Sequence, residues 1–276
     1  MALQDIIVHI DNSNSCQKRL KAAIALAQTH QAHITGVYNI PPAYLPRYAA
    51  AEIPFDIRKK EAEAAAEQAK KAGKIFQETV DREGLRSEWR VSEGDFVTNL
   101  CIHARYTDLM VLGQHDERDS NDSDFAPDDV ILRCGRPVLL VPFIGPQETL
   151  GKRVMVAWNG AREAVRAVND ALPILQKADK VEVVTVNIKT DGNSDNQIPG
   201  VDIAHHLARH GVNATASAME GVNINIGDTL LSHASDMSAD LVIMGAYGHS
   251  RLRELIMGGA TRSLLHQMTI PVLMSH

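Results

Sequence analysis

Short, unbroken runs of aliphatic residues alternate with longer amphipathic stretches along the whole chain. The clearest runs are residues 6–10, 34–37, 109–112, 138–141, 154–158, 181–186, 240–244 and 270–274. Strands buried on both faces have continuous Val, Ile and Leu runs of this kind, whereas half-exposed strands alternate. The pattern therefore predicts an α/β fold, a parallel sheet with helices on both faces. The Ala-, Glu- and Lys-rich stretch 58–83 is predicted to be one of these helices.

The second half of the chain repeats the pattern of the first. Each half opens on a strand that ends in a polar turn, at Asp11 and at Asn159, and the last strand of each half follows a proline, Pro137 or Pro271. A period near half the chain length indicates a duplicated domain rather than two unrelated ones. We therefore expect two similar units, each alternating strands and helices.

Within each half, a Gly-Asp pair comes before a helix and then a strand that ends in glycine. In the first half these residues are Gly94-Asp95 and Gly113. We expect Gly227-Asp228 and Gly245 to be their counterparts in the second half.

A length of 276 residues also favours two domains. Segment 142–151 contains two prolines and two glycines and is the natural linker. We therefore expect an N-terminal domain over residues 1–144 and a C-terminal domain over residues 152–276.

Charge and composition narrow the class of partner. The net charge of -6 gives no support for wrapping nucleic acid or an anionic membrane. No apolar run approaches the roughly 20 residues that cross a bilayer. The first residues also lack the features of a signal peptide. We expect a cytoplasmic protein whose three widely spaced cysteines are reduced.

Chemistry is most clearly indicated after the predicted strand at 240–244. Gly245, Gly248 and Gly258 follow that strand, and a helix is predicted to begin near Gly259. Parallel sheets bind ligands at the carboxyl ends of their strands. Glycines there let backbone N–H groups approach phosphate oxygens, and a helix N-terminus adds its positive end.

This spacing of three glycines, followed by Thr261 and Pro271, resembles the ATP-binding signature of universal stress proteins. The resemblance implies two tandem doubly wound α/β domains, each with a five-stranded parallel sheet, which are Rossmann-like and similar to the adenine nucleotide alpha hydrolases. It also implies ATP or AMP as the ligand, with Mg²⁺ as an accompanying cation. The last strands of the two domains, 138–141 and 272–274, are expected at an interdomain contact in which the domains meet face to face as a pseudo-dimer. Homodimerisation of the whole chain stays open.

By position, the resemblance assigns a nucleotide site to the C-terminal half. The backbone of Val186 is implied to meet adenine, the residues after the first strand to lie under the nucleoside, and the glycine loop to hold ribose and phosphates. Two departures concern Asn159, where the family usually has an acid, and Gly259, where it has Ser or Thr. The full set is Ala157, Trp158, Asn159, Val186, Met244, Gly245, Gly248, His249, Gly258, Gly259, Ala260 and Thr261.

The first half keeps only part of this pattern. Asp11 and Val37 are expected at the strand ends, but Gly113 is followed by a run of carboxylates and no second glycine. Like charges there would repel a triphosphate. The loop is either solvated or a divalent-cation site whose oxygen ligands would come from Asp116, Asp119, Asp122 and Asp124.

Other metal and catalytic patterns are weak. His206 and His210 can share a helix face, but no third ligand can be placed beside them, so no metal site is predicted. No P-loop motif or nucleophilic triad is present, and no catalytic residue is assigned. Three functions stay open: a nucleotide-binding regulatory protein of the stress response, a slow ATPase or adenylate-handling enzyme, and an interaction module that needs no nucleotide.

Overall fold

The computed structural model of the chain describes residues 2–42, 55–116, 118–119, 127–145, 149–186, 200–220, 225–247 and 259–276. The elements of the first half are β1 Asp5–Ile10, α1 Cys16–His30, β2 His33–Ile40, α3 Phe55–Arg82, β3 Ser87–Glu93, α4 Phe96–Ala104, β4 Leu109–Gly113, α5 Pro127–Arg133 and β5 Val138–Val141. Those of the second half are β6 Arg153–Ala157, α6 Arg162–Asp170, α7 Leu172–Leu175, β7 Lys180–Val186, α8 Val201–Arg209, β8 Ala214–Met219, α9 Ile226–Asp236, β9 Leu241–Gly245, α10 Gly259–Gln267 and β10 Val272–Ser275.

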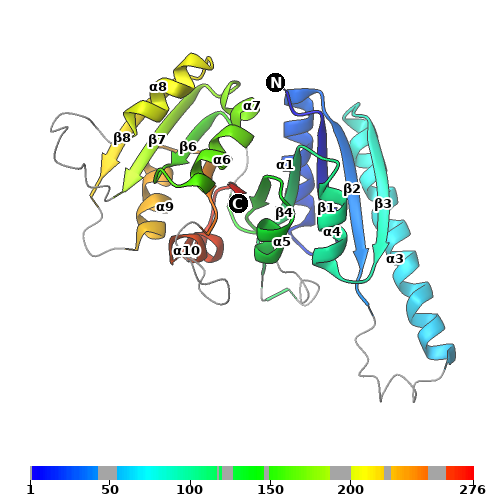
Figure 1. The fold of residues 1–276 in the computed structure, drawn as a ribbon. Helices are drawn as coiled ribbons and strands as arrows, with labels where there is room; N and C mark the ends of the chain where they lie inside the picture. The colour runs from blue at the N-terminus through cyan, green and yellow to red at the C-terminus, as the bar shows by residue number, and fades with distance from the viewer. Residues whose placement is uncertain are drawn as a thin grey trace.

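Over the described residues, the strands form one ten-stranded sheet in the order β3-β2-β1-β4-β5-β10-β9-β6-β7-β8 (Figure 1). Neighbouring strands within each half are parallel, and β5 and β10 pair antiparallel. Each half therefore contributes a five-stranded parallel sheet of doubly wound topology. This confirms the fold class predicted from the aliphatic runs.

The two halves are joined through their last strands. Leu139 of β5 lies opposite Leu273 of β10, in a ladder that runs from Val138 to Leu140. The prediction that these strands form the interdomain contact is confirmed, and the chain is a pseudo-dimer. The prediction that the domains meet face to face is wrong, because the sheets join edge to edge. Pairing at this edge satisfies backbone N–H and C=O groups that two separate sheets would leave open.

Apolar side chains fill two layers, one on each face of the joined sheet. One core cluster contains residues of α1 and α3 together with α6, α7 and α8, and the other contains residues of α4, α5, α9 and α10. The joining strands alternate between them. Leu139 and Val141 belong to the first cluster, whereas Val138 and Leu140 belong to the second. Both layers therefore continue across the joint.

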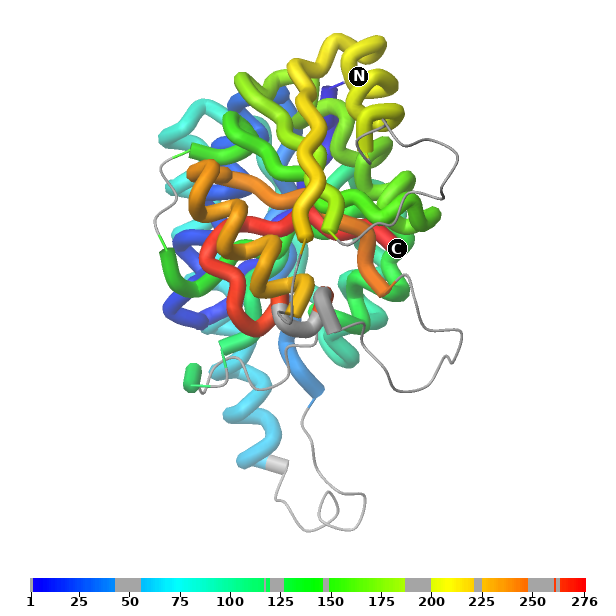
Figure 2. The backbone as a smooth tube through the Cα atoms, turned by 90° about the vertical axis from the view of Figure 1, so that its left-hand side faces the viewer, coloured from blue at the N-terminus to red at the C-terminus, as the bar shows by residue number. Residues whose placement is uncertain are grey.

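The long helix α3 confirms the prediction made from its composition. Its buried residues Ala69, Ala72, Phe76 and Val80 recur every three or four positions and face the sheet. Its first turns are exposed, and both ribbon and tube views show them projecting beyond the body of the protein (Figures 1 and 2).

The helices that precede β4 and β9, which are α4 and α9, are each capped at the N-terminus by a side chain. Asp95 accepts a hydrogen bond from Thr98 N (2.8 Å) at the start of α4, and Asn225 accepts one from Gly227 N (3.1 Å) at the start of α9. The counterpart of Asp95 is therefore Asn225, and the predicted counterpart Gly227-Asp228 lies inside α9. The correction follows from the chemistry of the cap, because Asp and Asn oxygens both accept from first-turn amides.

Polar contacts reinforce the joint between the halves. The buried amide of Gln114, just after β4, donates from Nε2 to the carbonyls of Leu265 (2.9 Å) and His266 (3.1 Å) near the end of α10. In the other direction, Arg166 of α6 donates to the carbonyl of Gly135 (2.8 Å). Each half thus supplies a donor for backbone oxygens of the other.

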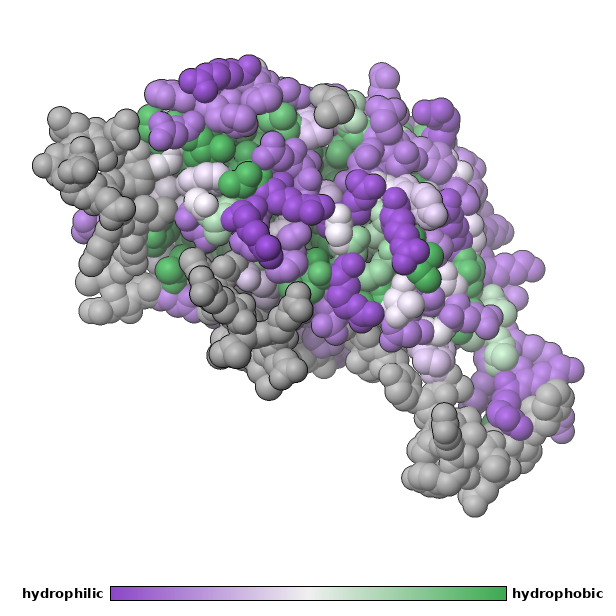
Figure 3. All heavy atoms as spheres, viewed as in Figure 1, coloured by the Kyte–Doolittle hydropathy of each residue, from purple (hydrophilic) through white to green (hydrophobic). Residues whose placement is uncertain are grey.

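The face shown in Figure 3 is mainly hydrophilic, with apolar side chains in smaller groups between polar ones. Among the described helices, none combines the length and the apolar character required to cross a bilayer. The three cysteines, Cys16, Cys101 and Cys134, are all free thiols.

Replacing Gln114 with leucine should destabilise the protein while preserving the volume of the side chain. Two carbonyls at the end of α10, that of the buried Leu265 among them, would lose this donor, which we expect to lower the free energy of unfolding by about 1–3 kcal/mol. Urea denaturation of the full chain measures this change. Gln28→Leu, at an exposed position, should stay within about 0.5 kcal/mol of the wild type. Equal stabilities for the two variants would contradict the proposed role of Gln114.

A second prediction concerns pH and His30, the last residue of α1. His30 is 4% exposed, and neither of its ring nitrogens has a hydrogen-bond partner among the described residues. Burial, and then the charge of Lys177, lower the pKa of His30 from 6.5 to about 4. As pH falls below 6.5 the unfolded chain takes up this proton first, so the native state loses stability until about pH 4.

His30→Leu should therefore gain stability over the wild type at acid pH, by on the order of 1 to 2 kcal/mol at pH 5 relative to the difference at pH 8. Urea denaturation of both proteins at the two pH values tests this. A stability difference that does not change with pH would show that His30 is not held neutral in the native state.

Candidate functional site

The candidate site of the C-terminal half lies where three strands end side by side. Ala157, the last residue of β6, is opposite Met244 on β9 and Val184 on β7. The chain leaves β6 towards α6 on one face and leaves β9 towards α10 on the other face. Such a change of direction between neighbouring parallel strands opens a crevice at their carboxyl ends. The topology therefore makes these strand ends the candidate place for a ligand.

Gly245 closes the floor of this crevice against α6. A Cβ atom added to Gly245 would lie 2.5 Å from Ala164 N and from the carbonyl carbon of Glu163. Only glycine allows the first turn of α6 to pack this closely against the end of β9. The glycine that the sequence pattern placed in the site therefore has a structural reason at its position.

The residues that follow β6 contribute in different ways. The side chain of Trp158 packs into the core on the α6–α8 face, so its backbone is what lies at the crevice. Asn159 is exposed, and its Oδ1 accepts a hydrogen bond from Ala161 N (3.0 Å), which forms the turn into α6. Ala157 and Val186 pack towards the α9–α10 face.

The remaining predicted residues belong to the loop and helix after β9. Gly259, Ala260 and Thr261 are the first three residues of α10, and Thr261 is buried. The other three predicted residues, Gly248, His249 and Gly258, lie outside the described residues.

A charged pair and the last residue of the chain lie beside Gly245. Arg162, the first residue of α6, donates from Nε to Glu163 Oε1 at 2.6 Å. Glu163 is buried, which by itself would raise its pKa. The hydrogen bonds from Arg162 and from its own N–H, with the nearby charge of His276, lower that pKa overall. Nδ1 of His276 contacts the carbonyl of Ala246 at 3.1 Å.

The N-terminal half contains the same crevice, and strand pairing gives the correspondence between halves. Ile6 on β1 lies opposite the first residue of β4, and Val154 on β6 lies opposite the first residue of β9. Ile6 and Val154 are therefore equivalent. Counting on from these two residues, Asp11 corresponds to Asn159.

The register also corrects one predicted residue. Val37 and Val184 lie opposite equivalent positions of β1 and β6, so they correspond to each other. The counterpart of Val186 is therefore Asn39, two residues beyond Val37. Apolar runs locate a strand in the sequence but do not reveal which residue is its last.

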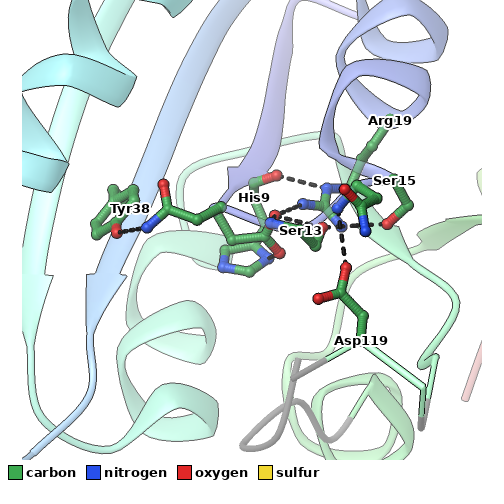
Figure 4. A network of polar contacts seen from close by, with 9 residues as sticks. His9, Ser13, Ser15, Arg19, Tyr38 and Asp119 are labelled. Carbon is green, nitrogen blue, oxygen red and sulfur yellow. Dashed lines mark hydrogen bonds and ion pairs between the residues drawn. The ribbon is translucent and has the colours of Figure 1, made fainter. Parts of the chain in front are cut away.

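A buried ion pair fills the N-terminal crevice (Figure 4). Arg19 of α1 is 2% exposed, and its guanidinium lies 2.7 Å from Asp11 Oδ1 while Nε donates to the carbonyl of His9 at 2.7 Å. A Cβ atom on Gly113 would lie 2.3 Å from Nη1 of Arg19. Arg19 thus occupies the space between the ends of β1 and β4. The equivalent residue in the C-terminal half is Ala167.

Hydrogen bonds around Asp11 extend this pair into a network (Figure 4). Ser13 donates to Asp11 Oδ1 from its N–H (3.0 Å) and its hydroxyl (2.6 Å). The N–H of Asn14 donates to Asp119 Oδ2 at 2.9 Å. A carboxylate from the acidic loop therefore lies against the chain that enters α1, where the C-terminal half has Arg162.

Burial and charge set the protonation of this network. Burial would raise the pKa of Asp11, but Arg19, then His9 and the Ser13 hydrogen bonds, hold it well below its usual range. Burial lowers the pKa of His9 to about 4, with Asp11 opposing and Arg19 adding to that shift. Near neutral pH, His9 is therefore uncharged and lies beside the ion pair of Asp11 and Arg19.

The described residues contain no cluster of three or more His, Cys, Asp or Glu side chains arranged for a metal ion. Asp116 pairs with Arg118 (2.9 Å), and Asp122 and Asp124 lie outside the described residues. His206 of α8 and His210, the residue that follows α8, are neighbours, with ring centroids 4.7 Å apart.

Comparison with known sequences agrees with the duplication. The sequence model of the universal stress protein family matches residues 3–142 and again residues 151–276. The chain belongs to the universal stress protein family. It therefore carries two tandem domains of this family. A universal stress protein of Synechocystis is 41% identical over 46 residues, a stretch that covers 17% of this chain and 16% of that protein.

Solved structures show the same fold over nearly the whole chain. A universal stress protein from Archaeoglobus fulgidus superposes with a TM-score of 0.76 at 16% identity, covering 98% of this chain and 95% of that one. A functionally unknown protein from Pseudomonas aeruginosa gives a TM-score of 0.60 at 15% identity, covering 99% and 92%. At these identities the likeness is one of fold.

The Arg19–Asp11 pair yields a stability prediction. Arg19→Met removes the cation and leaves a largely buried carboxylate without its partner, which should lower the free energy of unfolding by about 3 kcal/mol or more. The double variant Asp11→Asn with Arg19→Met removes both charges and should recover part of that loss. Urea denaturation of the wild type, the two single variants and the double variant measures the coupling. Strictly additive losses would contradict it.

Proposed function

We propose that this protein binds one adenine nucleotide, ATP or AMP, with Mg²⁺ as an accompanying cation, in its C-terminal half, and that it acts as a regulatory protein of the stress response. Membership of the universal stress protein family supports this. The crevice at the carboxyl ends of β6, β7 and β9 is the place where open parallel sheets take ligands.

The observation that carries the proposal is the packing of Gly245 on α6 at that crevice. This packing places the end of β9 against the first turn of α6, and N–H groups of a helix's first turn are donors of the kind that phosphate recognition uses. The glycine spacing after β9 and the start of α10 at Gly259 continue the same pattern. Gly248, His249 and Gly258 join the proposed site on the sequence pattern alone.

Each proposed contact has a chemical reason. The backbone of Val186, at the end of β7, would pair with the edge of adenine. Asn159 uses its Oδ1 within its own turn, so its amide N–H groups are what would donate to a ribose hydroxyl. The hydroxyl of Thr261, in the first turn of α10, would meet a phosphate, and Met244 would line the base.

We assign no nucleotide to the N-terminal half. Arg19 fills the space beside Gly113, and the Asp119 carboxylate lies against Asn14 N, where a phosphate would be repelled. A stoichiometry of one nucleotide per chain follows.

Calorimetric titration with ATP and AMP should give one site per chain, and Gly258→Asp should abolish or strongly weaken it, by about tenfold or more, because its side chain obstructs and its charge repels phosphate. Gly84→Asp is the matched control, because nothing lies within 4 Å of the added Cβ; since the φ of +70° strains any side chain there, circular dichroism first checks its fold, and it should bind like the wild type. Gly113→Asp is unsuitable as a control because the new side chain would collide with Arg19.

The same preparations separate the alternatives. Phosphate release by the wild type above that of Gly258→Asp would favour a slow ATPase. Absence of any binding by the wild type would refute the proposed site and leave an interaction module. Two sites per chain, one of them unchanged in Gly258→Asp, would show that the N-terminal half also binds.

A further inference from the structure

The two halves differ in charge at one pair of equivalent positions. These positions lie near the glycine that ends β4 or β9, Gly113 or Gly245. Asn14 and Arg162 each lie eight residues after the paired strand positions Ile6 and Val154. Both residues stand where the chain enters the first helix of its half. The same backbone position therefore carries a neutral side chain in one half and a cation in the other.

In the N-terminal half, the backbone N–H at this position binds a carboxylate. There, the Asp119 carboxylate accepts a hydrogen bond from the N–H of Asn14 at 2.9 Å. A carboxylate is an oxyanion with acceptor oxygens, as a phosphate group is. The duplicated fold thus contains an anion, supplied by the protein itself, against the backbone N–H whose counterpart in the C-terminal half belongs to Arg162.

Arg162 is arranged to receive an oxyanion. Its side chain is 84% exposed, yet it is fixed at one nitrogen, Nε, by the carboxylate of Glu163 at 2.6 Å. No described residue makes a hydrogen bond to its two terminal nitrogens. An arginine held at Nε still offers four N–H donors from those nitrogens, and planar donors of this kind match phosphate oxygens.

Glu163 is itself fixed by burial and by the nearby glycine. Its side chain is 7% exposed, and its Cβ lies 2.8 Å from the position that a Cβ on Gly245 would occupy. The carboxylate is therefore anchored beside the end of β9, and the guanidinium that it holds is exposed to solvent. The nearest comparable cation on α6, Arg166, is engaged with Gly135 and Asp170.

We propose that Arg162 is the phosphate-binding cation of the C-terminal site, positioned by Glu163, so that the ligand is recognised through a phosphate chain and not through the nucleoside alone. This inference rests on the proposed nucleotide site. Arg162 is a binding residue because it touches the ligand, whereas Glu163 acts through Arg162 and is a positioning residue.

The test compares ATP with adenosine in calorimetric titrations of the full chain. Arg162→Gln should weaken ATP binding by roughly tenfold to a hundredfold, as expected for losing hydrogen bonds to a charged group, and should change adenosine binding by less than about twofold. Arg162→Lys keeps the charge without the planar donors and should fall between. Arg209→Gln, which removes an exposed arginine at the end of α8, is the matched control and should bind both ligands like the wild type.

Two further readouts separate a binding role from a structural one. Added salt should weaken ATP binding more steeply in the wild type than in Arg162→Gln, because one phosphate contact has been removed. Glu163→Gln should weaken ATP binding less than Arg162→Gln, with adenosine again unaffected. Circular dichroism checks that each variant is folded.

The outcomes distinguish the two proposals. If the wild type binds both ligands but Arg162→Gln loses neither, or loses both equally, the assignment of Arg162 is wrong and the nucleotide site stands. If the wild type binds neither ATP nor adenosine, the nucleotide site fails and the assignment of Arg162 fails with it.

Discussion

The antiparallel pairing of β5 with β10 determines how the two halves of this protein are arranged. Each strand is only four residues long, and every side chain in both is buried. Because the pairing is edge to edge, the layer of helices on each face continues from one half to the other. The donors that cross the joint, Gln114 and Arg166, reach carbonyl groups that this arrangement brings beside them. A face-to-face arrangement would have buried a helical layer and left both edge strands open.

Within this frame, duplication has preserved backbone geometry while allowing charge to diverge. Gly113 and Gly245 end equivalent strands, but one lies under the guanidinium of Arg19 and the other lies against the backbone of α6. Replacing Ala167 by Arg at the equivalent position would bring a buried charge into the second crevice. Such a charge requires a partner, which Asp11 supplies in the first half and the uncharged Asn159 does not. The strand ends of the first half therefore hold an internal ion pair, whereas those of the second half lack both of its charged residues.

The sequence predicted the fold well because parallel strands buried on both faces leave a strong signal. Every aliphatic run became a strand, and residues 58–83 became most of α3. The prediction was less accurate for the positions of individual residues within the strands and helices. Val37 was matched to the position of Val186, which corresponds to Asn39, and Gly227-Asp228 was matched to Gly94-Asp95, although the counterpart of Asp95 is Asn225. Register depends on hydrogen bonds between strands that are distant in sequence, and the capping position depends on turns whose lengths differ between the halves. A repeat in hydrophobicity does not fix either.

In the candidate site, too, some residues could be predicted from the sequence and others could not. Gly245 was predicted because a glycine after a buried strand can be recognised in the sequence. Arg19 was not predicted, although it lies next to Leu20 on the mainly apolar buried side of α1. A lone arginine in such a helix is a detectable signal, since a buried cation has to meet an anion. Its partner Asp11 directly follows the preceding strand, and the loop with Asp119 is about a hundred residues further on. Only the folded sheet, which places the ends of β1 and β4 side by side, reveals that these carboxylates and the arginine belong to one network.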